Sequence, residues 1–68
     1  MKKVVVVTDV NSADQALYID GEYTLSDHTI YAADIASQVG DEPFTLDAYS
    51  AESDGELWPK RIEKLKRV

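Results

Sequence analysis

The side chain best suited to chemistry is His28, the one histidine of the sequence, which lies between Asp27 and Thr29. An imidazole just ahead of a helix can contact an anion that the free amide groups of the first helical turn also attract. A local hydrogen bond to the turn is the simpler use of the same side chain. Thr29 or Asp27 is expected to cap the helix. His28 and Thr29 are therefore one half of a candidate anion site.

Aromatic side chains are numerous for so short a chain. They are Tyr18, Tyr23, Tyr31, Phe44, Tyr49 and Trp58. Phe44 is expected in the core, whereas Tyr31 lies off the apolar stripe of the expected helix and should be exposed. Rings with a polar tip are favoured at contact surfaces. Such a surface could hold a partner protein, or stack a purine or nicotinamide ring while Arg61 or Lys64 reaches the phosphates. Each ring could also simply lie at the edge of the core.

Signatures of catalysis are weak throughout the chain. Ser26 and Asp27 flank His28 closely, but side chains adjacent in sequence seldom form a catalytic triad. The three glycines are far apart, so there is no glycine-rich phosphate loop. Paired carboxylates can do acid–base work, yet in so acidic a chain they are typical of a solvated surface. With one histidine and no cysteine, a nitrogen–sulfur metal site is not expected. We expect no enzyme, no cofactor and no metal.

The net charge of −6 is unevenly distributed along the chain. Residues 1–58 contain Lys2 and Lys3 against twelve acids, whereas residues 59–68 contain five cations against Glu63 alone. The negative body disfavours direct binding to nucleic acid or to an anionic membrane. The basic end either neutralises that body and the end of its own helix, or contacts an anion or phosphate.

The spacing of apolar residues predicts the elements that must position these groups. The expected strands are residues 2–10, 15–20, 22–25 and 44–49, the expected helix is 30–39, and a short helix opens at Pro59. Four consecutive valines in the first strand indicate a central position. Asp20-Gly21 predicts a hairpin. The result is an α+β fold in one domain, residues 1–68: a small, mostly antiparallel sheet of about four strands in the order β-β-β-α-β-α, with one packed helix and a short C-terminal helix.

Finer expectations follow from the same patterns. In the helix, a narrow stripe should pack on the sheet and Gly40 should end the helix. The stripe is Ala32, Ile35, Ala36 and Val39. Tyr23 and Leu25 should share one face of the third strand. Residues 50–56 are expected to form a loop containing Asp54-Gly55, and Leu57 and Trp58 should anchor the last helix.

Size and the first residues bear on assembly and location. A chain of 68 residues without a disulfide has a small core, for which self-association is a common support, so we expect a homo-oligomer. The apolar run from Val4 to Val7 is shorter than the roughly 7–15 residues of a secretory segment. The expectation is a cytoplasmic protein without a membrane partner.

The segment from Leu17 to Gly40 carries a resemblance. Its Leu-Tyr-Ile-Asp-Gly hairpin, the turn with His28 and an alanine-rich helix are similar to a group of small, uncharacterised proteins of bacteriophages and prophages. The Trp58-Pro59 step also resembles their Pro-started final segment, whereas Asp27 departs from the glycine expected before His28. The resemblance implies a phage accessory protein in the host cytosol and no particular activity.

These observations support one class of function and leave its target open. We expect a non-catalytic accessory binding protein that counters host defence, either by sequestering a small nucleotide-like immune signal at a subunit interface or by inhibiting a host defence protein. The first hypothesis assigns ligand contacts to Tyr31, His28, Thr29, Trp58 and Arg61. The second uses the acidic surface as a mimic of nucleic acid. A small structural phage component is a third alternative.

Overall fold

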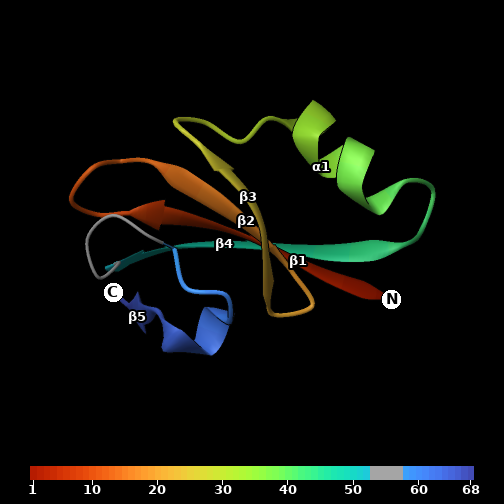
Figure 1. Cartoon of the computed structure of the whole chain (residues 1–68). Helices are drawn as coiled ribbons and strands as arrows, with labels where there is room; N and C mark the ends of the chain where they lie inside the picture. Colours follow the sequence, from red (N-terminus) through yellow and green to blue (C-terminus); the bar gives the residue numbers. More distant parts are fainter. Residues whose placement is uncertain (53–57) are drawn as a thin grey trace.

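A single mixed sheet organises the fold. The computed structural model describes residues 1–52 and 58–68, and its sheet has five strands in the order β3-β2-β1-β4-β5 (Figure 1). The strands are β1 (Lys2–Asp9), β2 (Gln15–Ile19), β3 (Glu22–Asp27), β4 (Phe44–Glu52) and β5 (Lys66–Arg67). The helix α1 spans Ala32–Val39, and a 3-10 turn, η1, spans Ile62–Lys64. The predicted α+β class is confirmed, and the predicted four strands become five.

The valine-rich strand β1 lies in the middle of the sheet, as its composition predicted. It pairs antiparallel with β2 and parallel with β4. Val4 and Val7 face opposite sides of this central strand. Both are fully buried because each face of the sheet is covered there. The parallel pair makes the sheet mixed. Parallel neighbours require a crossover between them, and the β3–α1–β4 connection supplies it (Figure 1).

The predicted hairpin at Asp20-Gly21 joins β2 and β3. Both residues have positive φ, 53° and 84°, which is the requirement of the two-residue turn whose twist suits a hairpin. A bulge then shifts the register, so that Tyr18 pairs with Tyr23 but Leu17 pairs with Leu25. Tyr23 and Leu25 therefore lie on opposite faces, and the prediction that they share a face is wrong.

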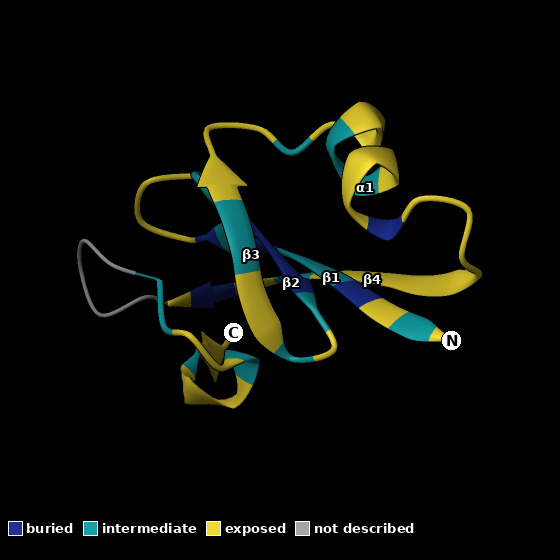
Figure 2. Cartoon of the chain, turned by 45° about the vertical axis from the view of Figure 1, so that its right-hand side comes forward, coloured by how far each residue is buried: buried dark blue, intermediate teal, exposed yellow. Residues whose placement is uncertain are grey.

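The helix covers one face of the sheet with few side chains. Val39 is buried and Ile35 is half-buried against the cluster of Val4 and Leu17. The alanines of the predicted stripe are exposed, because α1 is only eight residues long and approaches the sheet through its last turn (Figure 2). The predicted stripe is thus wider than the real one.

The helix also begins later than predicted. Its N-cap is Tyr31, whose amide donates to Oδ2 of Asp34 at 2.8 Å. Asp27 ends β3 instead, and Thr29 lies in the link that follows. The predicted N-caps, Thr29 and Asp27, are therefore wrong. The carboxylate of Asp34 in the first helical turn instead accepts the backbone amide of the N-cap residue Tyr31.

The C-terminal segment covers the opposite face. Trp58, Ile62 and Leu65 pack on a second buried cluster that includes Val7 and Tyr18. The helix predicted from Pro59 is wrong: the carbonyl of Pro59 accepts the hydroxyl of Tyr18 at 2.6 Å, and the chain forms only the η1 turn before β5. The sheet thus has a small core on each face.

Two further expectations concern β4 and its end. Phe44 is 40% exposed, so its predicted place in the core is wrong, because α1 does not reach the start of β4. Residues 50–52 belong to β4 rather than to a loop. The rest of the predicted loop with its Asp54-Gly55 turn, and the anchor Leu57, lie outside the described residues.

Candidate functional site

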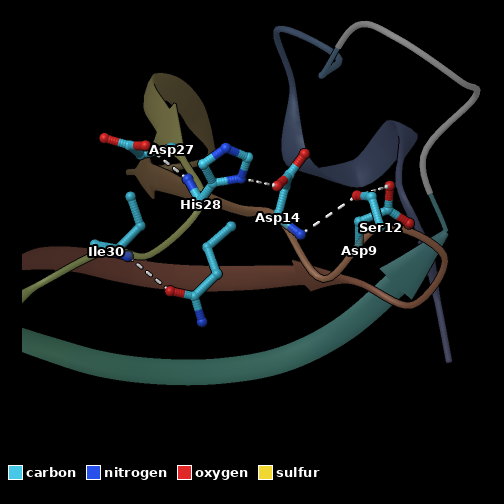
Figure 3. A network of polar contacts seen from close by, with 7 residues as sticks. Asp9, Ser12, Asp14, Asp27, His28 and Ile30 are labelled. Atoms are coloured by element: carbon cyan, nitrogen blue, oxygen red, sulfur yellow. Dashed lines mark hydrogen bonds and ion pairs between the residues drawn. The ribbon is translucent and has the colours of Figure 1, made fainter.

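His28 is bound to a carboxylate at the end of the sheet where β1 turns into β2. Its Nδ1 lies 2.7 Å from Oδ1 of Asp14, and its amide donates to Oδ1 of Asp27 (Figure 3). The ring remains 92% exposed. The hydrogen bond and charge of Asp14, with a smaller effect of Asp27, raise the pKa of His28 above its usual value. The imidazole is therefore held in a negative environment.

The turn that carries Asp14 is built around another aspartate. Asp9 is 7% exposed, and its carboxylate accepts the amide of Asn11 and the hydroxyl of Ser12, both at 3.0 Å. The hydroxyl of Ser12 in turn accepts the amide of Asp14 at 3.3 Å (Figure 3). This chain of bonds orients Asp14 toward His28.

The link between β3 and α1 is fixed on its other side by Gln15. The amide of Ile30 donates to Oε1 of Gln15 at 2.7 Å, and Nε2 of Gln15 donates to Thr8 at 3.2 Å. Thr29 and Tyr31 flank this bond, and Tyr31 is 66% exposed, as predicted. The structure thus brings His28, Thr29 and Tyr31 into one short, anchored segment.

Arg61 lies at the other end of β3. Its Nε donates to Glu63 at 3.1 Å and its Nη1 to Glu22 at 3.4 Å. The hydrogen bond that Arg61 donates to Glu63 is the main reason that the pKa of Arg61 is raised. Backbone bonds fix the same place, because the amide of Ile62 donates to the carbonyl of Gly21 at 2.8 Å. Arg61 therefore joins the C-terminal segment to the hairpin.

Trp58 is a packing residue in this structure. It is half-buried against the cluster that contains Tyr18, on the face opposite α1. An indole in such a position contributes mainly apolar contact area. Its face is therefore engaged with the protein and is only partly available to a ligand ring.

The five residues expected to bind a ligand form two separate groups. Arg61 bridges to Glu22 at the start of β3, whereas His28 follows Asp27 at its end. At about 3.3 Å per residue, the six residues of β3 extend for about 20 Å. Within one chain, His28, Thr29 and Tyr31 therefore do not share a site with Trp58 and Arg61.

Several exposed carboxylates of the described surface form no ion pair. Exposed acids that form no ion pair with a described lysine, arginine or histidine are Asp20, Asp27, Asp41, Asp47 and Glu52. The ion pairs that do form engage His28, Arg61 and Lys2. The excess of negative charge is therefore presented to solvent.

Other kinds of site are not apparent among residues 1–52 and 58–68. These residues enclose no pocket, and they contain no group of three or more histidines and acids placed to hold a metal ion. No helix in this part of the chain is long and apolar enough to cross a membrane.

Comparison with known proteins adds no assignment. No protein-family model matches the chain, and no curated protein or solved structure matches it.

Sequence reasoning missed the pairing of His28 with Asp14 and the hydroxyl bond from Tyr18 to Pro59. The two partners of the second bond are separated by 41 residues, and no local pattern indicates it. The pairing of His28 with Asp14 could have been inferred in part from the predicted hairpin, because residues just beyond the ends of two paired strands face each other. A simple two-residue hairpin, however, would have placed Asp27 rather than His28 opposite Asp14.

Proposed function

We propose that this chain is a non-catalytic accessory binding protein that inhibits a partner protein by presenting carboxylates to a basic surface. One observation carries the proposal: His28 and Arg61, the two cationic groups best placed to hold a phosphate, are each bonded to carboxylates. The positive charge of both groups is therefore offset by neighbouring carboxylates.

Electrostatics favours a protein partner over a nucleotide. A phosphate that approaches His28 would face Asp14 and Asp27, and one that approaches Arg61 would compete with Glu22 and Glu63. Like charges in contact oppose binding, whereas a cationic surface gains attraction and a faster encounter. The exposed carboxylates that form no ion pair supply the same attraction elsewhere on the molecule.

The partner class follows from this charge. A basic groove that normally holds nucleic acid is the surface that an array of carboxylates can occupy. The proposal includes the phage-type role indicated by the sequence resemblance, with a host protein in the cytosol as the target.

The test uses the immobilised chain and a bacterial lysate at low and high salt. A variant with Asp20→Asn, Asp27→Asn, Asp41→Asn and Glu52→Gln keeps the shape and removes four charges. The matched control, Lys60→Gln with Lys64→Gln, makes the chain more acidic. We expect captured proteins to be lost from the first variant, retained by the control and released by salt, because exposed charge attraction is screened.

Native mass spectrometry of the purified chain distinguishes the alternative. Sequestration of a nucleotide-like signal requires a site shared by two copies, since one chain keeps the five expected ligand residues apart. A retained mass of a few hundred daltons per oligomer would contradict the proposal. Capture that is equal for the wild type and the four-charge variant would contradict it as well.

A further inference from the structure

One long edge of the sheet is open along most of β4. Among the described residues, β5 covers this edge only at Ala51 and Glu52. Residues 44–49 have no strand neighbour on that side within the described part of the chain. An open strand edge is a template for pairing with another chain.

The direction of the backbone groups along β4 can be assigned from bonds at its ends. The carbonyl of Pro43 accepts the amide of Lys2 at 3.3 Å. The carbonyl of Ala51 accepts the amide of Val10 at 3.1 Å. Backbone groups alternate in direction along a strand, so the odd-numbered residues of β4 are directed at β1.

The even-numbered residues are directed outward. The amide of Val68 reaches the carbonyl of Ser50 from the open side, at 3.0 Å. The outward groups of the open stretch therefore belong to Phe44, Leu46 and Ala48. Val68 closes the edge at one end and Pro43, which has no amide hydrogen, precedes it at the other.

The same three residues form an uncovered apolar stripe on the face that carries α1. Leu46 lies beside Val4 in the register, and Ala48 lies beside Val6. Val4 is buried in the cluster under α1, yet Leu46 is 57% exposed. The helix ends over β1 and β2 and leaves the stripe open (Figure 2).

We propose that β4 pairs with β4 of a second copy, antiparallel about a two-fold axis at Leu46. Leu46 then faces Leu46 of the second copy, and Phe44 faces its Ala48. All of these residues have outward backbone groups, as the hydrogen-bonded pairs of an antiparallel ladder require. The ladder ends before Val68 on both sides, so the open stretch and the paired stretch coincide. The interface is isologous and closed.

Side chains favour this register over the neighbouring one with its axis at Asp47. With the axis at Leu46, Asp47 faces Thr45 of the second copy. An axis at Asp47 would place two carboxylates directly opposite each other, which is destabilising. On the other face of the ladder, the two stripes of Phe44, Leu46 and Ala48 merge into one and cover each other's apolar atoms. This assembly does not depend on the partner proposed above.

Asp47 makes the association reversible. In the single chain its Oδ1 accepts the amide of Ala48 at 2.9 Å, so this outward donor is satisfied without a partner. In the dimer the carbonyl of Phe44 of the second copy takes that place. The carboxylate is then released toward Thr45 of the second copy, and this exchange offsets part of the gain from the apolar stripe.

Sedimentation equilibrium up to millimolar protein tests the proposal with three variants. Leu46→Lys charges the stripe, and Ala48→Pro removes one outward amide without touching the β1 ladder. Each should weaken dimerisation by about tenfold or more. Thr45→Lys places a cation opposite Asp47 and should tighten it severalfold. Circular dichroism establishes that each variant is folded. A wild type that stays monomeric, or a dimer that both Leu46→Lys and Ala48→Pro leave unchanged, overturns the proposal.

Cross-linking tests the register, and the chain offers a clean background because it has no cysteine. Oxidation of the double variant Thr45→Cys with Asp47→Cys should give a disulfide-linked dimer. Neither single variant should cross-link efficiently, because in this register each new thiol faces a residue of another type. Efficient cross-linking of Thr45→Cys alone, or of Asp47→Cys alone, would overturn the register.

Discussion

The Nδ1 atom of His28 lies 2.7 Å from Oδ1 of Asp14, fourteen positions earlier in the chain. This contact ties the β3–α1 link to the β1–β2 turn. It depends on the bulge at Leu17 and Tyr18, which moves the pairing of β2 with β3 by one residue. Without the bulge, two aspartates would face each other there. The candidate anion contact is thus part of a structural ion pair.

The first prediction concerns pH. The folded pKa of His28 is raised above its unfolded value of 6.5 by Asp14, so its stabilising contribution is complete below about pH 6.5 and is lost as the pH rises through the folded pKa. We expect the free energy of unfolding to fall as the pH rises above about 6.5. Urea titrations of the wild type and of His28→Gln measure this. A pH dependence that persists unchanged in His28→Gln contradicts the assignment.

The second prediction concerns the bond between the sheet and the C-terminal segment. Tyr18→Phe removes the hydroxyl that donates to Pro59 at 2.6 Å and should lower the free energy of unfolding by about 0.5–1.5 kcal/mol. Tyr49→Phe is the control on the same face, since no hydrogen bond of its hydroxyl within the described residues is known. Equal losses in the two variants would argue against a specific role of the bond.

Tyr18 also has a signature in alkali. Burial raises its pKa from 10.0 to about 12, with a smaller effect of Tyr23. Its ionisation should therefore be delayed in an ultraviolet titration of the folded chain, and stability should fall from about pH 10 upward because the unfolded chain ionises first. In Tyr18→Phe the delayed step should disappear.

The fourth prediction concerns the hairpin turn. Gly21 has a φ of 84°, and a Cβ placed there would lie 3.0 Å from Nη2 of Arg61. Gly21→Ala should destabilise the chain by about 1 kcal/mol or more, because both the conformation and the approach are unfavourable for a side chain. Urea titrations of the wild type and of Gly21→Ala measure this loss, and an unchanged free energy of unfolding would contradict the assignment.

Local patterns predicted much of this fold. The valine run of β1, the Asp20-Gly21 turn and the end of α1 at Gly40 each have a short-range physical cause, and the structure confirms them. The bulge could not be predicted, because it inserts one residue into β3 without changing its apolar composition. Its consequence, the reversal of faces between Tyr23 and Leu25, was missed for that reason.

The C-terminal segment and the candidate site were harder to predict. A proline at position 59 and the spacing of Ile62 and Leu65 are typical of a helix. The segment instead forms a 3-10 turn and a short strand, because β5 pairs with β4 and the carbonyl of Pro59 accepts the hydroxyl of Tyr18. The grouping of Trp58 and Arg61 with His28 assumed that side chains of suitable chemistry converge. Arg61 and His28 are held apart by β3, because they lie at its opposite ends.

The most direct test of the central claim is the salt dependence of the affinity for a captured partner. The claim is that exposed carboxylates such as Asp27, Asp41 and Glu52 attract a basic surface, so the logarithm of the association constant should fall steeply and linearly with the logarithm of salt concentration. The slope should be shallower for the four-charge variant. An affinity that is constant up to molar salt, or a slope that the variant leaves unchanged, would contradict the account.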